Sequence, residues 1–107
     1  MAERIGRDEF EEKVLKSPLP VLVDFYADSC VACKKLAPAL GQAEERLGDR
    51  LQICKVNTNY ETGLTEEYEI LSRPTLIVFR NGQEAGRKTG ALKPQELIDW
   101  LELYLAK

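Results

Sequence analysis

A nearly continuous apolar segment, Val21–Ala27, constrains the fold more than any other part of this sequence. It is rich in β-branched and aromatic residues, which is typical of a strand that is covered on both faces. A long amphipathic helix is predicted from Val31 to about Leu47, with Pro38 in its interior, where we expect a kink. A buried strand that leads into such a helix is typical of α/β proteins with parallel strands.

The rest of the chain predicts further helices and strands that alternate with each other. They are helices over Asp8–Lys16, Thr62–Glu69 and Pro94–Ala106, strands over Leu51–Asn57, Thr75–Arg80 and Glu84–Thr89, a tight turn at Asn81–Gly82, and a short edge strand over Glu3–Ile5. Successive strand–helix–strand units predict a parallel sheet, to which the hairpin adds antiparallel edge strands. The length of 107 residues leaves room for one domain, 1–107.

Composition and charge narrow the possible partners and location. The net charge is -3 and no basic run is present, so we expect neither nucleic acid nor a membrane surface as a partner. The chain has no segment that resembles a signal peptide or a membrane span of about 18 apolar residues, which favours a cytoplasmic location. No additional apolar face stands out, and we expect a monomer.

The cysteines limit the chemistry, because the chain has three of them and no histidine. Catalysis by Cys–His or Ser–His pairs and zinc binding through histidine are therefore excluded. Cys30 and Cys33 lie three residues apart at the start of the long helix, so their sulfurs can reach disulfide distance. The helix start favours a thiolate at Cys30. We expect Cys30 to be exposed and to attack, and Cys33 to be shielded and to resolve the mixed disulfide.

Two further residues are candidates for a chemical role. Asp24 interrupts the apolar strand, and a buried carboxyl there would have a raised pKa and could exchange a proton with Cys33. The alternative is that Asp24 turns to solvent at a sheet edge. Cys54, on the second long strand, is expected to be a small buried hydrophobic residue rather than a regulatory or metal-binding thiol.

The segment Val23–Lys34 resembles the active-site region of the thioredoxin family. Further matches follow in the same order along the chain: Pro38, Lys55-Val56-Asn57, Arg73-Pro74-Thr75 and Gly90-Ala91-Leu92. The resemblance implies a thioredoxin fold, with a mixed sheet of four or five strands flanked by about four helices. It also implies reduction of protein disulfides by dithiol–disulfide exchange, with no metal and no cofactor beyond the redox-active Cys30–Cys33 disulfide.

The resemblance assigns roles to three residues outside the cysteine motif. It implies that Pro74 follows a cis peptide bond in a loop that faces the disulfide, which would leave the backbone of Arg73 free to pair with an extended substrate segment. Gly90 matches a glycine beside the same groove, where a side chain would block close approach. Lys55 matches a lysine that tunes the buried carboxyl of Asp24, although a solvated strand lysine remains an equal alternative.

Four positions in the expected groove depart from the family pattern. They are Ser29 in place of tryptophan, Val31 and Ala32 in place of Gly-Pro, and Arg73 in place of an apolar or hydroxylated residue. These changes leave the chemistry intact and bear on redox potential and partner choice. Our hypothesis is that the charge of Arg73 stabilises the Cys30 thiolate and selects partners with acidic flanks.

The expected partners are client proteins that contain disulfides and a donor of the thioredoxin-reductase type, because no nucleotide-binding motif is present. A dedicated reductant of one partner enzyme is an alternative within the same chemistry. A redox-inert thioredoxin-like module that only binds a partner is a second alternative. A metal-binding module is a third, since CxxC is half of a zinc site, although a second CxxC is missing.

Overall fold

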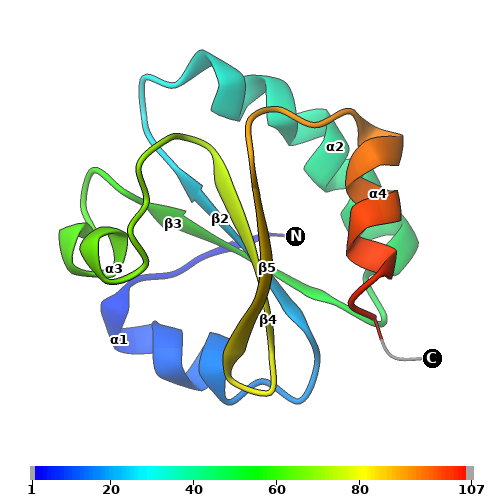
Figure 1. Cartoon of the computed structure of the whole chain (residues 1–107), viewed down its shortest axis with the longest axis horizontal. Coiled ribbons are helices and arrows are strands. Elements are labelled where there is room, and N and C mark those ends of the chain that lie inside the picture. The colour runs from blue at the N-terminus through cyan, green and yellow to red at the C-terminus, as the bar shows by residue number, and fades with distance from the viewer. Residues whose placement is uncertain (1, 106–107) are drawn as a thin grey trace.

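The computed structural model describes residues 2–105 and contains one five-stranded sheet with helices on both faces (Figure 1). The elements in chain order are β1 (Glu3–Arg4), α1 (Arg7–Phe10) continued by a π-helical segment (Glu11–Leu15), β2 (Val21–Tyr26), α2 (Val31–Leu47), β3 (Gln52–Asn57), α3 (Thr62–Glu67), β4 (Thr75–Arg80), β5 (Gln83–Thr89) and α4 (Pro94–Glu102). No helix in this part of the chain is long and apolar enough to span a bilayer.

The strand order is β1-β3-β2-β4-β5, so β2 is the central strand, as its apolar sequence predicted. Strands β1, β3 and β2 are parallel to each other, whereas β4 is antiparallel to both β2 and β5. The prediction that both hairpin strands lie at an edge is wrong for β4, which is interior. Its first five residues are all buried, and pairing with β2 covers the side that an edge strand would expose.

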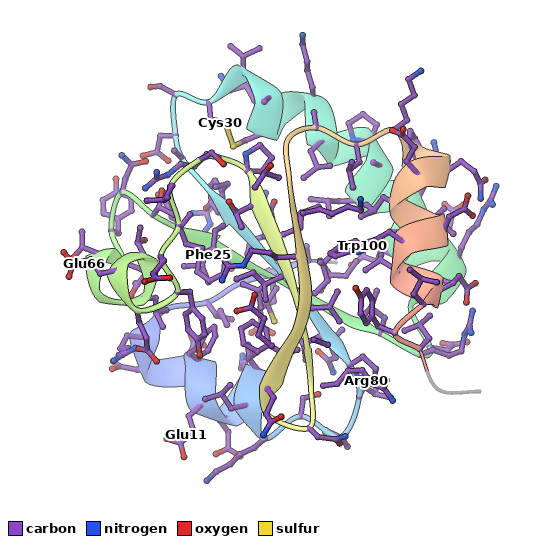
Figure 2. All side chains as sticks on the ribbon, in the orientation of Figure 1. Glu11, Phe25, Cys30, Glu66, Arg80 and Trp100 are labelled. Carbon is purple, nitrogen blue, oxygen red and sulfur yellow. A yellow bond between two sulfur atoms is a disulfide. The ribbon has the colours of Figure 1, made fainter. Side chains whose placement is uncertain are left out.

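Two apolar layers hold the helices against the sheet. One layer joins the sheet to α2 and α4, and its members include Leu22, Leu36, Leu76, Leu97 and Leu101. The other layer, on the side of α1 and α3, includes Phe10, Val23, Phe25, Leu64 and Phe79. Alternate residues of β2 enter opposite layers, as the period of a strand requires. Figure 2 shows Phe25 and Trp100 on opposite sides of the sheet.

The predicted boundaries differ from the structure mainly at helix ends. The first helix changes to π-helical geometry in its second half, where the Lys16 N–H donates to the carbonyl of Glu11 (2.9 Å). Helix α3 ends at Glu67, and Glu69 has left-handed backbone geometry (φ 53°). Helix α4 ends at Glu102, and the predicted end at Ala106 lies outside the described residues.

The hairpin between β4 and β5 confirms the turn predicted from sequence. Asn81 and Gly82 both have positive φ, 52° and 79°, as a two-residue turn between antiparallel strands requires. The outermost strands of the sheet are the two-residue β1 on one side and the seven-residue β5 on the other.

Candidate active site

The strand directions bring four loops to one end of the sheet. Because β2 and β3 are parallel, their carboxyl ends meet at this end, where the loops that follow them begin. Because β4 and β5 form an antiparallel hairpin and β4 runs against β2, the start of β4 and the end of β5 lie at the same end. The motif Cys30–Cys33, the cis peptide before Pro74 and the backbone of Gly90 are thereby gathered from distant parts of the chain.

The two cysteines form a disulfide at the start of α2, with their Cα atoms 5.2 Å apart. Cys30 is the N-cap residue in extended geometry (φ -108°, ψ 109°), and its sulfur accepts a hydrogen bond from the Cys33 N–H at 3.1 Å. The first N–H groups of a helix have no partner within the helix, and they stabilise an anion placed there. The geometry therefore suits a thiolate at Cys30 once the disulfide is reduced.

The sulfur of Cys30 is covered by the loop that precedes β4. It lies 3.5 Å from the carbonyl oxygen of Arg73, which is joined to Pro74 by a cis peptide bond. Figure 2 shows Cys30 at the start of α2, facing this loop. Cys30 is consequently half-buried rather than exposed, and Cys33 is half-buried as well, so the predicted contrast in exposure is absent from the oxidised form.

The other predicted groove residues lie next to Cys30 along the chain or contact Pro74. Ser29 is exposed, Val31 is 67% exposed and Ala32 is half-buried. Gly90 has φ 89°, and its N–H donates to the carbonyl of Pro74 at 3.0 Å. Among the described residues other than its two chain neighbours, none has an atom within 4 Å of the position a Cβ would take at Gly90, so a side chain there would project into open space beside the loop.

Asp24 is fully inside the protein, with 1% of its surface exposed, on the central strand. This position rules out the alternative of a solvent-facing edge residue. Its Oδ1 atom has no hydrogen-bond partner among the described residues. Burial raises the pKa of Asp24 from 3.8 to about 6, and the charge of Lys55 opposes that rise. Such a carboxyl can hold or release a proton near neutral pH.

Asp24 faces α2 across a cavity of about 220 Å³. The cavity is lined by Asp24, Tyr26, Ala27, Asp28, Cys33, Lys34, Ala37 and Lys55. Lys55 lies opposite Asp24 in the β2–β3 register, and its Nζ atom is 4.7 Å from the centroid of the Tyr26 ring. The cavity thus joins the buried carboxyl to the second cysteine of the motif.

A hydrogen-bond network between the loops was not predicted from sequence. Asn57 donates to the Asp28 carboxylate (2.8 Å), and the side chain of Asn59 accepts from the Asp28 N–H (2.9 Å). Arg73 Nε donates to Thr58 Oγ1 (3.0 Å), which in turn donates to a carbonyl of β2. The run of Asn57, Thr58 and Asn59 at the end of β3 was the available signal, because short polar side chains at the end of a strand commonly bond neighbouring loops.

Cys54 is buried at the interface of β3 with α1, and burial raises the pKa of its thiol to about 11. It belongs to the apolar layer on that side of the sheet and lies outside the site. Within residues 2–105, no group of three or more Cys, Asp and Glu side chains is arranged to hold a metal ion.

Comparisons with known proteins match the chain to one family. The family model described as thioredoxin matches residues 2–103. A thioredoxin of Rickettsia felis is 36% identical over 101 residues, covering 94% of this chain and 96% of the relative. A thioredoxin of Acidithiobacillus ferridurans is 39% identical over 101 residues, covering 94% of each. Rice thioredoxin Y, a chloroplastic protein, is 42% identical over 90% of this chain, which spans only 57% of that relative.

The family match and the site geometry agree with each other. A mixed five-stranded sheet with helices on both faces is the thioredoxin fold. A cysteine pair bonded across one helical turn, with one sulfur at the helix start, is suited to dithiol–disulfide exchange. The chain therefore belongs to the thioredoxin family.

Proposed function

We propose that this protein reduces disulfide bonds in client proteins by dithiol–disulfide exchange. The Cys30 thiolate attacks one sulfur of a client disulfide, which forms a mixed disulfide and releases the first client thiolate. Cys33 then attacks the Cys30 sulfur, so the Cys30–Cys33 disulfide forms and the second client thiolate leaves. The position of the Cys30 sulfur at the start of α2, where it accepts the Cys33 N–H at 3.1 Å, is the observation that carries this proposal.

Asp24 supplies the proton transfer that the second step needs. Cys33 must lose its proton before it attacks, and the Asp24 carboxylate is the acceptor on the other side of their shared cavity. The departing client thiolate takes up a proton from solvent, and the protein gains a disulfide as the client gains two thiols. Burial raises the pKa of Asp24 to about 6, which is still below neutral pH, so the carboxylate form predominates at neutral pH and can act as the base.

The client occupies a groove around the Cys30 sulfur. Its walls come from Ser29, Val31, Ala32, Arg73, Pro74 and Gly90. An extended client segment pairs with the backbone of Arg73, as a strand added to an exposed edge does. The Arg73 side chain is held by Thr58 and makes no ion pair within residues 2–105, so an acidic residue of the client is its natural counter-charge.

Electrons come from a separate reductase of the thioredoxin-reductase type, with the cytoplasm as the compartment. Disulfides in the cytosol are mostly transient and catalytic, which suits a pair that cycles. The chloroplastic relative makes the chloroplast the other candidate compartment. Fractionation of the source cells followed by detection with an antibody against this chain distinguishes the two.

The deciding experiment combines a disulfide-reduction assay with two single variants. Cys30→Ser is expected to abolish reduction of insulin with a dithiol as electron donor. Cys33→Ser is expected to retain the first step and to accumulate a mixed disulfide that is visible on a non-reducing gel. Cys54→Ser is the matched control, because this cysteine is buried away from the site.

A redox-inert binding module would give a different outcome. In that case the wild-type protein would fail to reduce insulin, and Cys33→Ser would trap no client. Full activity of Cys30→Ser would equally contradict the proposed order of attack.

A dedicated reductant of one partner is the second candidate. The fixed cation of Arg73 and the exposed Val31 beside the cysteines favour selectivity over generality. Mass spectrometry of the mixed disulfides trapped by Cys33→Ser discriminates between a dedicated reductant and a general one. One dominant client supports the dedicated role, and many unrelated clients support a general reductase.

A further inference from the structure

Tyr26 occupies an unusual place beside the reactive centre. It is the last residue of β2, and its hydroxyl is buried without a hydrogen-bond partner among the described residues. A buried tyrosine hydroxyl normally finds a partner, so the hydroxyl does not explain why tyrosine stands here. The face of the ring, in contrast, is occupied, because Lys55 Nζ lies 4.7 Å from its centroid. This separation lies within the range of a cation–π interaction.

The ring and the ammonium lie on the same face of the sheet as Asp24. Residues two apart on a strand share a face, which places Tyr26 beside Asp24, and Lys55 is the residue opposite Asp24 on β3. The titratable and charged groups around the cavity are Asp24 and Tyr26 on β2, Asp28 in the following loop, Cys33 and Lys34 on α2, and Lys55 on β3. The neighbour of Asp24 on β4 is the apolar Leu76.

Among these groups, Lys55 is the charge that acts on Asp24. Burial raises the pKa of Asp24, and the Coulombic effect of Lys55 lowers it. Asp28 is already bound to Asn57 and is exposed, as is Lys34. A free lysine side chain samples many rotamers, and its ammonium prefers water. Something must therefore hold the Lys55 ammonium near the buried carboxyl, and the Tyr26 ring is the group that contacts it.

We propose that Tyr26 is a positioning residue for the exchange reaction: its ring holds the Lys55 ammonium at the cavity shared by Asp24 and Cys33, as counter-charge to the Asp24 carboxylate. The catalytic part of this inference rests on the proposed function, whereas the electrostatic part does not. When Cys33 transfers its proton to Asp24 and attacks the Cys30 sulfur, the carboxylate must first be ionised. The held ammonium keeps it ionised at lower pH than burial alone would allow.

The test measures the Asp24 titration directly, by the carboxyl ¹³C chemical shift of the oxidised protein against pH. Tyr26→Leu removes the ring face, and the Asp24 pKa is expected to rise by about half a unit. Tyr26→Phe keeps the ring and loses only the unpartnered hydroxyl, so the titration is expected to match that of the wild type. Lys55→Met removes the charge itself and is expected to raise the pKa by about one unit.

A double variant separates positioning from burial. If Tyr26 acts through Lys55, Tyr26→Leu has no further effect on the Asp24 titration once Lys55→Met is present. The proposal is overturned if Tyr26→Leu titrates like the wild type, if its shift persists in the Lys55→Met background, or if Lys55→Met causes no shift. Thermal unfolding of each variant confirms that the fold is retained, and Tyr26→Phe supplies a folded variant with the ring in place.

A kinetic readout then connects the titration to the reaction. The rate of the resolving step is measured against pH in single turnovers with a neutral small disulfide. In Tyr26→Leu, the acidic limb of this pH profile is expected to move to higher pH by the same amount as the Asp24 titration. A shifted titration with an unshifted acidic limb would refute the role of Asp24 in the reaction while leaving the Tyr26–Lys55–Asp24 coupling intact. Absence of any disulfide reduction would count against the proposed function alone.

Discussion

Replacing Asp24 with asparagine is expected to change how the stability of the protein depends on pH. Asp24 is 1% exposed on the central strand, and its pKa rises from 3.8 to about 6 on folding because of burial. The folded protein therefore binds this proton more tightly than the unfolded chain does. The destabilisation caused by ionised Asp24 is absent below about pH 4, grows as the pH rises to about 6, and stays constant above that value.

The magnitude follows from the two pKa values. Each pH unit between them corresponds to about 1.4 kcal/mol, so the ionised carboxyl destabilises the folded state by about 3 kcal/mol at neutral pH. Asparagine has nearly the same shape and carries no charge, so its own cost of burial does not change with pH. As the pH rises from acid to slightly alkaline, the free energy of unfolding of Asp24→Asn is thus expected to increase by about 3 kcal/mol relative to that of the wild type.

The assay is urea unfolding of the oxidised wild type and variant at three values, about pH 4, 6 and 8. Taking the difference between the two proteins cancels the titration of the other carboxyl groups, since they are common to both. The free energy of unfolding of the variant minus that of the wild type is expected to be lowest at the acid end and to increase toward neutral pH. Parallel stability curves across this range would refute the reasoning, because Asp24 would then titrate equally in the folded and unfolded states.

Three further outcomes are expected. Arg73→Thr removes the positive charge of a residue whose backbone carbonyl contacts the Cys30 sulfur. If that charge stabilises the thiolate, the variant should raise the Cys30 pKa by up to about one unit, measured by the ultraviolet absorbance of the thiolate; an unchanged titration would reject the hypothesis. Gly90→Ala forces a side chain onto a residue with φ 89° and should lower stability by about 1 kcal/mol while raising KM for client proteins, because the Cβ projects beside the groove. Cys54→Ser places a hydroxyl in an apolar layer and should lower stability by about 1–3 kcal/mol with the rate of disulfide reduction unchanged, and unfolding and turnover measurements check both parts.

Local patterns predicted most of the elements, because the forces that form them act over a few residues. The helix at Val31–Leu47 and the strand at Thr75–Arg80 have the predicted bounds, since helical spacing and a buried run are each visible within one window. The turn at Asn81–Gly82 requires positive φ at both positions, and this dipeptide favours it. The interior position of β4 was not predicted from the sequence. A hairpin motif predicts only one of the two strands that pair with an interior strand, and it contains no information about the second.

The site was predictable where its chemistry is local and unpredictable where it depends on contacts across the sequence. The cysteine pair spans a single helical turn, so its spacing revealed it. The partial cover over Cys30 comes from Arg73, which lies 43 residues away. The contact of Lys55 with Tyr26 depends on the register between two strands, which no single segment of sequence contains.

The unequal outer strands have a consequence for self-association. A long outer strand presents unpaired backbone groups on which another chain can add a strand and begin an aggregate. Here β1 offers only two residues, whereas β5 offers seven, and the longer strand carries Glu84, Arg87 and Lys88 at its exposed positions. A second copy that added a strand here would set its own side chains directly beside these charges, so the charges along β5 disfavour growth of the sheet into a fibre.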